Sequence, residues 1–170
     1  ALAVPAAAGM YYGYDKLEGE PVRVGVIGTG DQGNNGHILP MNPDYCKLAA
    51  FSDIRPSNVR RTWDNINKKF GAAAKDVKYY ADYKELLDRE DIEMVSIALP
   101  LHLHAPVTIE ALRKGKHVLC EKLMAHNVTQ CKEMIREADK AKRLLAIGHQ
   151  RHYSYLYANC RSVIEQGDVM

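Results

Sequence analysis

The hydrophobic residues of the chain change their period repeatedly after residue 20, and each change predicts a strand or a helix. Glycine, proline, asparagine and aspartate stand between many of these segments, as is typical of turns. The run at 93–99 is apolar enough for a strand that is buried on both faces of a sheet. Strands are predicted at residues 22–27, 47–52, 77–80, 93–99, 117–120 and 144–147.

Segments of helical period follow the predicted strands, and several begin at a residue suited to a helix start. Pro56 is suited to the first position of a helix that ends before Gly71. Asp82 and Glu85 have the spacing of a capping pair, and Asn127 is suited to cap another helix. The residues expected on the buried faces of helices are Val59, Trp63, Ile66 and Phe70; Leu86 and Leu87; Leu103, Val107 and Ala111; Val128, Cys131, Met134, Ile135 and Ala138; and Leu156, Cys160, Val163 and Ile164.

The alternation of strands and helices predicts an α/β fold. Parallel strands joined by right-handed helical crossovers form a doubly wound, mostly parallel sheet with helices on both faces, which is the Rossmann arrangement. We expect residues 21–170 to form one such domain. Ligands of these sheets bind beyond the carboxyl ends of the strands, so the candidate functional residues are those that directly follow a strand.

The segment 1–20 precedes the predicted domain and begins with small, uncharged residues. Ala6 and Ala8 have the spacing of a signal-peptide cleavage site, which favours a signal remnant and a periplasmic location. No basic residues precede this stretch, and an alanine-rich helical arm on a cytoplasmic protein is the alternative. The segment therefore leaves both interpretations open.

Composition and charge exclude several classes of function. The 170 residues suffice for one domain of ordinary size. The 23 basic and 21 acidic residues give a net charge of +2, without the basic excess typical of nucleic-acid-binding domains. The four cysteines have neither disulfide-framework nor zinc-site spacing, so no metal is expected. No uncharged run is long enough to cross a membrane, so we expect neither nucleic acid nor a membrane as a partner.

A glycine-rich motif directly follows the first predicted strand. Residues 28–33 read Gly-Thr-Gly-Asp-Gln-Gly, which is the G-x-G-x-x-G pattern of a dinucleotide-binding turn between a strand and a helix. Gly28 would make the tight turn, Gly30 would let the backbone approach a pyrophosphate, and Gly33 would let the helix pack on the strand. A flexible loop is the simpler alternative. The residues expected to contact the cofactor here are Gly28, Thr29, Gly30, Gln32 and Gly33.

Asp53 ends the second predicted strand and lies twenty residues after Gly33, the spacing of the acid that binds the adenosine ribose. A carboxylate at this position repels a 2′-phosphate, which favours NAD as the cofactor. Arg55, two residues later, is able to pair with that phosphate, so NADP is the alternative.

Two further clusters of candidate residues follow the fourth and fifth predicted strands. A lysine at the end of a strand is able to exchange a proton with a hydroxyl or carbonyl group that undergoes hydride transfer, whereas most lysines are simply solvated. The two histidines lack a third ligand for a metal, and a polar pair on a loop is the simpler alternative. The candidate residues are Leu99, Pro100, His102, His104, Glu121 and Lys122.

Several of these segments together resemble the glucose–fructose oxidoreductase and inositol dehydrogenase family (Gfo/Idh/MocA). The resemblance runs from about Pro21 to Met170, and its most specific part is the stretch 111–122, Ala-Leu-Arg-Lys-Gly-Lys-His-Val-Leu-Cys-Glu-Lys. It implies an NAD(P)-dependent oxidoreductase that acts on sugars, polyols or their derivatives and is a homo-oligomer when complete. It also implies that Lys122 takes part in proton transfer and that Gln150 and Arg151 line the cofactor crevice.

The sequence departs from the family pattern in two places. Leu123 follows Lys122 where the family has a proline, and leucine removes the restriction that proline places on the preceding lysine. Family members also continue into a second, substrate-binding domain with a catalytic D-x-x-x-H pair, which we expect to be absent from these 170 residues. Two alternatives to a sugar or polyol dehydrogenase therefore stay open: an NAD-dependent glycosidase of the same family, and a non-catalytic NAD-binding module.

Overall fold

The computed structural model describes residues 19–167, whose six strands form a single sheet. All paired strands are parallel, and their order is β3-β2-β1-β4-β5-β6. The chain proceeds outward in opposite directions from β1 and β4, and in sheets of this topology the ligand site lies at the carboxyl ends of these two strands. The doubly wound α/β fold expected from the sequence is confirmed. The strands are β1 (Val22–Ile27), β2 (Cys46–Ser52), β3 (Lys78–Tyr80), β4 (Met94–Ile97), β5 (His117–Cys120) and β6 (Leu145–Ile147).

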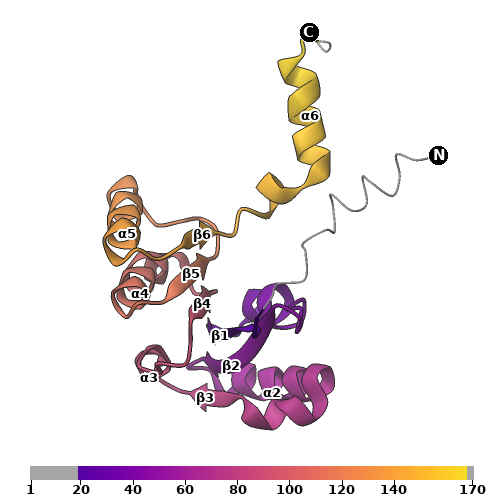
Figure 1. The fold of residues 1–170 in the computed structure, drawn as a ribbon, viewed down its shortest axis with the longest axis vertical. Coiled ribbons are helices and arrows are strands. Elements are labelled where there is room, and N and C mark those ends of the chain that lie inside the picture. The colour runs from indigo at the N-terminus through magenta and orange to yellow at the C-terminus, as the bar shows by residue number, and fades with distance from the viewer. Residues whose placement is uncertain (1–18, 168–170) are drawn as a thin grey trace, which may run out of the picture.

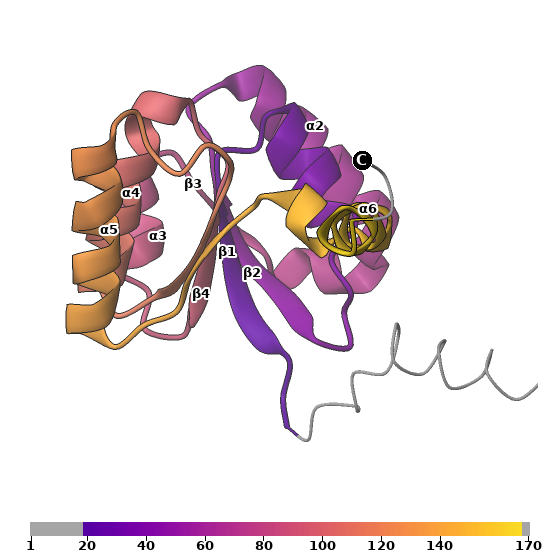
Figure 2. The same ribbon diagram turned by 90° about the horizontal axis from the view of Figure 1, so that it is seen from above.

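Helices cover both faces of the sheet. Helices α3, α4 and α5 lie on one face, and α2 lies on the other (Figures 1 and 2). Short helical turns precede or follow several of the longer elements. The α-helices are α2 (Pro56–Phe70), α3 (Tyr83–Leu87), α4 (Leu101–Arg113), α5 (Val128–Ala141) and α6 (Tyr155–Glu165); the short turns are η1 (Gly33–Ile38), η2 (Gly71–Asp76) and η3 (Gln150–Tyr153).

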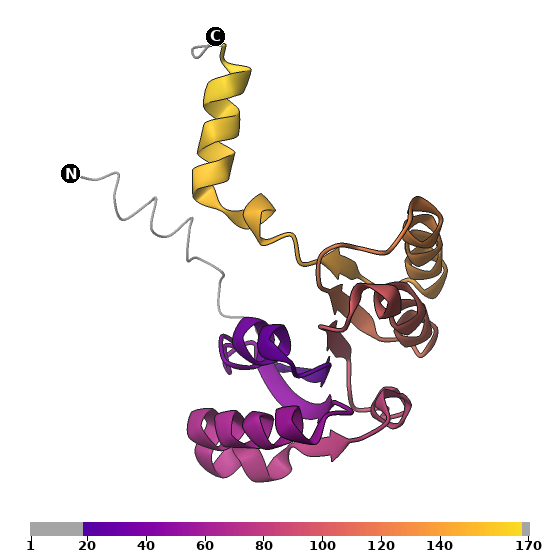
Figure 3. The ribbon, with the colours of Figure 1, turned by 180° about the vertical axis from the view of Figure 1, so that it is seen from behind.

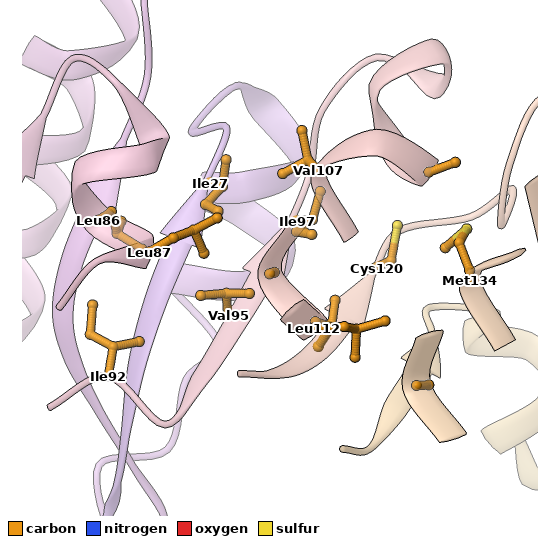
Figure 4. Packing of buried hydrophobic residues seen from close by; sticks show 14 of the residues in the cluster. Ile27, Leu86, Leu87, Ile92, Val95, Ile97, Val107, Leu112, Cys120 and Met134 are labelled. Carbon is orange, nitrogen blue, oxygen red and sulfur yellow. The ribbon is translucent and has the colours of Figure 1, made fainter. Parts of the chain in front are cut away.

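Each face of the sheet packs into its own hydrophobic core. On the face of α3, α4 and α5, strand residues such as Ile27 and Ile97 belong to one buried cluster with Leu86 and Leu112 from the helices (Figure 4). On the α2 face, the Phe51 ring makes an edge-to-face contact with Trp63, and the ring centroids are 5.2 Å apart. The two cores fix the strands in register, so the loops at their carboxyl ends emerge from a rigid frame.

The helix starts expected from the sequence are confirmed. Pro56 is the first residue of α2, and it needs no backbone N–H there. The Asp82 carboxylate accepts a hydrogen bond from the Lys84 N–H, and the Asn127 side chain accepts one from the Gln130 N–H. These side chains bind backbone donors that have no partner within the first helical turn.

Two of the expected buried stripes are wrong in part. In α5, Met134 and Ala138 are buried, but Val128 and Ile135 are exposed because the stripe facing the sheet is narrower than the sequence pattern. Helix α6 forms as expected but has no buried residue, and it extends away from the sheet (Figures 1 and 3). Leu156, Cys160, Val163 and Ile164 are therefore exposed.

The expected arm or signal remnant at residues 1–20 lies almost wholly outside the described residues. Within residues 19–167, no helix has the length and apolar character that crossing a lipid bilayer requires.

Candidate functional site

The three glycines of residues 28–33 differ in what surrounds them. Gly28 has a φ of +86°, and a Cβ added to it would lie 2.4 Å from the Ala98 carbonyl oxygen. A Cβ on Gly33 would lie 2.0 Å from the Gly28 carbonyl oxygen. A Cβ on Gly30 would meet no atom within 4 Å. The fold thus requires glycine at the first and third positions, whereas the space above Gly30 is open to a ligand.

The carboxylate of Asp53 holds this loop against the end of β2. Its Oδ2 atom accepts hydrogen bonds from the Thr29 N–H at 2.8 Å and from the Asn58 side-chain amide at 3.1 Å. Its Oδ1 atom accepts one from the Arg55 N–H at 2.8 Å. Asp53 is 8% exposed, and Oδ1 keeps a lone pair for a further donor. The Arg55 guanidinium is exposed at the start of α2.

Asn34 is a second support of the loop, and the sequence pattern does not predict it. It is buried, and its side-chain amide donates to the Thr29 carbonyl oxygen and to the Thr62 hydroxyl at 3.0 Å. Asn34 therefore ties the glycine loop to α2. Its only sequence signal is its place directly after Gly33.

A crevice of about 220 Å³ opens beside the loop at the carboxyl ends of β4 and β5. An adjoining hollow of about 410 Å³ shares Lys122 with it. The structure thus brings the candidate residues after β1, β4, β5 and β6 to one edge of the sheet. The crevice is lined by Gln32, Ala98, Leu99, Leu101, His104, Glu121 and Lys122, and the hollow by Lys122, His149, Gln150, Arg151 and His152.

Glu121 forms a buried network beneath the crevice. Its Oε1 atom accepts hydrogen bonds from the Gln32 side-chain amide at 2.8 Å and from His37 Nε2 at 3.0 Å. The other ring nitrogen of His37 is 2.9 Å from the Ser96 hydroxyl. The Lys122 N–H donates to Glu121 Oε2 at 3.2 Å. The network thus connects Gln32 of the glycine loop and His37 of the following turn to Glu121, which directly precedes Lys122.

His37 lies in the π-helical turn η1, and its side chain is only 8% exposed. The glycine motif predicts a regular helix after it, and nothing in that pattern selects His37. The wider π turn differs from an α-helix in the direction that each residue faces, so helical periodicity does not predict its inward side chains. Its only sequence signal is its place four residues after Gly33, the last glycine of the motif.

His102 and His104 lie in the first turn of α4. The alternative prediction of a polar histidine pair on a loop is therefore wrong. His102 is exposed, whereas His104 is 2% exposed. His104 Nδ1 is 2.7 Å from the Leu123 carbonyl oxygen, and Nε2 is 2.8 Å from the Leu99 carbonyl oxygen. A neutral imidazole donates to one of these oxygens and an imidazolium to both. His104 therefore joins the loops that follow β4 and β5.

Pro100 directly precedes α4 and is exposed, and neither Pro100 nor His102 is among the residues that line the crevice or the hollow. In residues 19–167, no group of three or more histidine, cysteine, aspartate or glutamate side chains is arranged to hold a metal ion. A larger hollow of about 580 Å³ lies at the opposite edge of the sheet, beside Glu93 and His117. It contains neither the glycine loop nor the residues that follow the strands.

The crevice fits a dinucleotide on the evidence of the glycine loop itself. Gly28 and Gly33 close the turn, and Gly30 leaves room for an anionic group against the backbone. The N-terminal end of the following helical turn carries backbone N–H donors that favour an anion. Asp53 is one residue beyond the adjacent strand, where a ribose hydroxyl would donate to a carboxylate.

Known proteins resemble this chain over most of its length. The model of an oxidoreductase family with an NAD-binding Rossmann fold, GFO_IDH_MocA, matches residues 22–149. Inositol 2-dehydrogenase from Salmonella typhimurium is 30% identical over 87% of this chain and 43% of the relative. Alpha-N-acetylgalactosaminidase from Shewanella oneidensis is 29% identical over 87% of this chain and 32% of the relative.

Solved structures agree with the fold. The 3-ketoreductase KijD10 from Actinomadura kijaniata, solved with NADP and TDP-benzene, has a TM-score of 0.71 and 26% identity over 87% of this chain and 43% of its own. The WlbA dehydrogenase from Chromobacterium violaceum, solved with NADH and UDP-GlcNAcA, has a TM-score of 0.75 and 24% identity over 89% of this chain and 41% of its own. The chain thus spans about two-fifths of the inositol dehydrogenases that it matches. It belongs to the Gfo/Idh/MocA family of oxidoreductases, and it carries the NAD-binding Rossmann fold of that family.

Proposed function

We propose that the chain is the cofactor-binding part of an enzyme that transfers a hydride between a nicotinamide cofactor and a sugar, polyol or derivative. The observation that carries the proposal is the open space above Gly30, in a loop where the flanking glycines are enclosed by backbone. The same edge of the sheet presents Lys122. The inositol dehydrogenases among the relatives support a polyol or sugar as the substrate class.

The candidate residues divide into direct contacts and supports. We assign the diphosphate to residues 28–33 and the ribose to Oδ1 of Asp53, which favours NAD over NADP, with Arg55 as the group that would accept a 2′-phosphate. His104 and Glu121 are buried and hydrogen-bonded to the protein, so we assign them to support of the crevice. The residues assigned to the nicotinamide side are Leu99, Pro100, His102, Lys122, Gln150 and Arg151. Leu99 and Lys122 line the crevice, and Lys122, Gln150 and Arg151 line the hollow.

Lys122 is the catalytic residue of the proposal. A nicotinamide cofactor bound here would supply the acceptor or donor of the hydride. The Lys122 ammonium group, at the junction of the crevice and the hollow, would move the proton on the substrate oxygen. The Lys122 backbone N–H is hydrogen-bonded to the Glu121 carboxylate, and the Leu123 carbonyl oxygen is bonded to His104. These hydrogen bonds fix the main chain on both sides of Lys122. They act at the place where the family pattern has a proline after the lysine and this chain has Leu123.

A titration with NADH tests the proposal. We expect the fluorescence of NADH to change on saturable binding at one site per chain, and Gly30→Val to abolish the change because its side chain fills the open space. Gly71→Val is a matched control, since that glycine also has no neighbour within 4 Å but lies at the end of α2, away from the crevice. Its positive φ lowers stability, so the control is compared at a temperature at which both variants stay folded. Equal loss of binding in both variants would contradict the proposal.

A glycosidase that uses NAD is the second candidate function. It is favoured by the similarity to the alpha-N-acetylgalactosaminidase of Shewanella oneidensis. Its first step would be the same hydride transfer in the same crevice, and the hydride would return to the sugar after the glycosidic bond breaks. Release of sugar without net formation of NADH would favour this candidate, whereas net NADH formation would favour a dehydrogenase. NADH binding without either reaction would favour a non-catalytic module.

A further inference from the structure

The hollow beyond Lys122 is lined by basic and polar side chains alone. It is about 410 Å³ in volume and bounded by Lys122 from the end of β5 and by residues 149–152 after β6. None of its lining residues is acidic. The Glu121 carboxylate of the neighbouring crevice is buried and already accepts hydrogen bonds from Gln32 and His37. The hollow therefore concentrates positive charge without a counter-charge of its own.

The side chains around the hollow have free donors. Within residues 19–167, the Lys122 ammonium group, the Arg151 guanidinium and the two imidazoles of His149 and His152 form no hydrogen bond or ion pair with the protein. The Arg151 guanidinium lies over the Tyr157 ring at 5.3 Å, which occupies its face and leaves its N–H edge available. The two imidazole rings are stacked with centroids 5.4 Å apart. Each imidazole carries at least one N–H in every protonation state.

We propose that this hollow binds the anionic group of an acidic sugar, either a carboxylate or a phosphate. The inference rests on the proposed function and narrows its substrate class. The positive charges of Lys122 and Arg151 repel each other across the hollow until an anion enters, and the imidazoles of His149 and His152 add N–H donors. Arg151 offers the paired N–H donors that suit carboxylate and phosphate oxygens. The uncharged hydroxyl that reacts would lie nearer Lys122, which belongs to both the crevice and the hollow.

The diphosphate of the cofactor is a less suitable occupant of this hollow. The glycine loop follows β1, whereas His149 follows β6, and these strands are three positions apart in the sheet. At about 4.8 Å between neighbouring strands, the two sites are roughly 14 Å apart. An anion in the hollow would therefore be a group other than the diphosphate that binds above Gly30.

The test is an NMR titration of the chain saturated with NAD, followed on the imidazole signals of His149 and His152. The probes are D-glucuronate, D-glucose 6-phosphate and neutral D-glucose. We expect at least one of the two anions to bind at least about tenfold more tightly than glucose, and the preference to fall as salt rises. A carboxylate-only or phosphate-only preference identifies the source of the anionic group. Arg151→Gln and His152→Gln should each lower the preference at least threefold, and Arg136→Gln, an exposed arginine of α5, should leave it unchanged.

Equal affinity for the three sugars would overturn the inference, as would a preference that the Arg136→Gln and Arg151→Gln variants lose equally. An anion preference that is present without NAD and vanishes when NAD saturates the chain would place the anion above Gly30 and would also overturn it. Failure of NADH to bind overturns the proposed function itself. NADH binding without an anion preference overturns only this inference.

Discussion

Alanine substitutions at Gly30 and Gly33 separate the binding role of the loop from its structural role. The two glycines are three residues apart in the same loop, and each substitution adds a single methyl group. At Gly33 that methyl group would lie 2.0 Å from the Gly28 carbonyl oxygen, whereas at Gly30 it would meet nothing within 4 Å. Gly30 also lacks the positive φ that disfavours alanine.

The structure sets the expected magnitudes. Overpacking in a core typically costs 1–3 kcal/mol, and the atom that the Gly33→Ala methyl group meets is backbone, which cannot rotate away, so we expect a loss of more than about 3 kcal/mol. Gly30→Ala restricts the unfolded chain without causing a clash in the folded one, so it should raise the free energy of unfolding by about 0.4–1 kcal/mol. Its methyl group takes the space assigned to the diphosphate. A hydrogen bond to a charged group contributes about 1.5–3 kcal/mol, so the loss of one such bond should lower the affinity for NADH at least about tenfold.

Urea unfolding and NADH titration of both variants measure these quantities. The expected result is a stable Gly30→Ala variant with weak NADH binding and a Gly33→Ala variant that is unfolded or strongly destabilised. A Gly30→Ala variant that binds NADH with unchanged affinity would refute the assignment of the open space to the cofactor. A Gly33→Ala variant of normal stability would refute the close contact between the two backbone segments.

Four further predictions concern the supports of the crevice, the lysine and the pH dependence of stability. Asp53→Asn should lower the free energy of unfolding by about 2 kcal/mol and weaken NADH binding, because the side-chain NH₂ of asparagine would face backbone N–H groups that now donate to the carboxylate. Urea unfolding and NADH titration measure the two effects, and unchanged stability would contradict the role of Asp53 in holding the loop. Lys122→Met should keep NADH affinity within about threefold while turnover by the enzyme falls at least about 100-fold; normal kcat would exclude proton transfer by this lysine. His37→Ala should cost about 2–4 kcal/mol, since it leaves the buried Glu121 carboxylate with one side-chain donor fewer, and His37→Gln should recover part of the loss in thermal unfolding. Burial and the Glu110 carboxylate raise the pKa of Tyr83 to about 12, and burial raises the pKa of Cys120 from 9.0 to about 11, so stability that is fully present below pH 9 should fall as pH rises toward 12, and Tyr83→Phe should flatten the upper part of that curve.

Hydrophobic periodicity predicted the fold because the sheet is buried on both faces. The strands of the centre are short apolar runs, and the helices that cover them carry one apolar stripe each, so the two periods are distinct along the chain. Asp82 and Asn127 were predictable as helix caps because side-chain capping depends on local sequence alone.

The network beneath the crevice was not predictable from local sequence. The partners of Glu121 come from Gln32 and His37, which are more than eighty residues away along the chain. The π turn that directs His37 inward has no strong signature in the hydrophobic pattern. For the same reason, the sequence suggested a direct cofactor contact for Glu121, whereas its geometry favours a supporting role.

The environment of individual side chains was also beyond the sequence. His102 and His104 are two residues apart, yet one is exposed and the other is buried between two carbonyl oxygens, because the first turn of α4 directs them to opposite sides. The apolar residues of α6 have helical spacing, but no element of the described chain buries them. Periodicity thus predicts that a helix forms, not which surface covers it.

The structure of the chain in complex with NAD tests the central claim most directly. We expect the diphosphate to lie above Gly30, a ribose hydroxyl to donate to Asp53 Oδ1, and the nicotinamide ring to lie in the crevice beside Lys122. A dinucleotide bound elsewhere, such as in the larger hollow beside Glu93 and His117, would contradict the account.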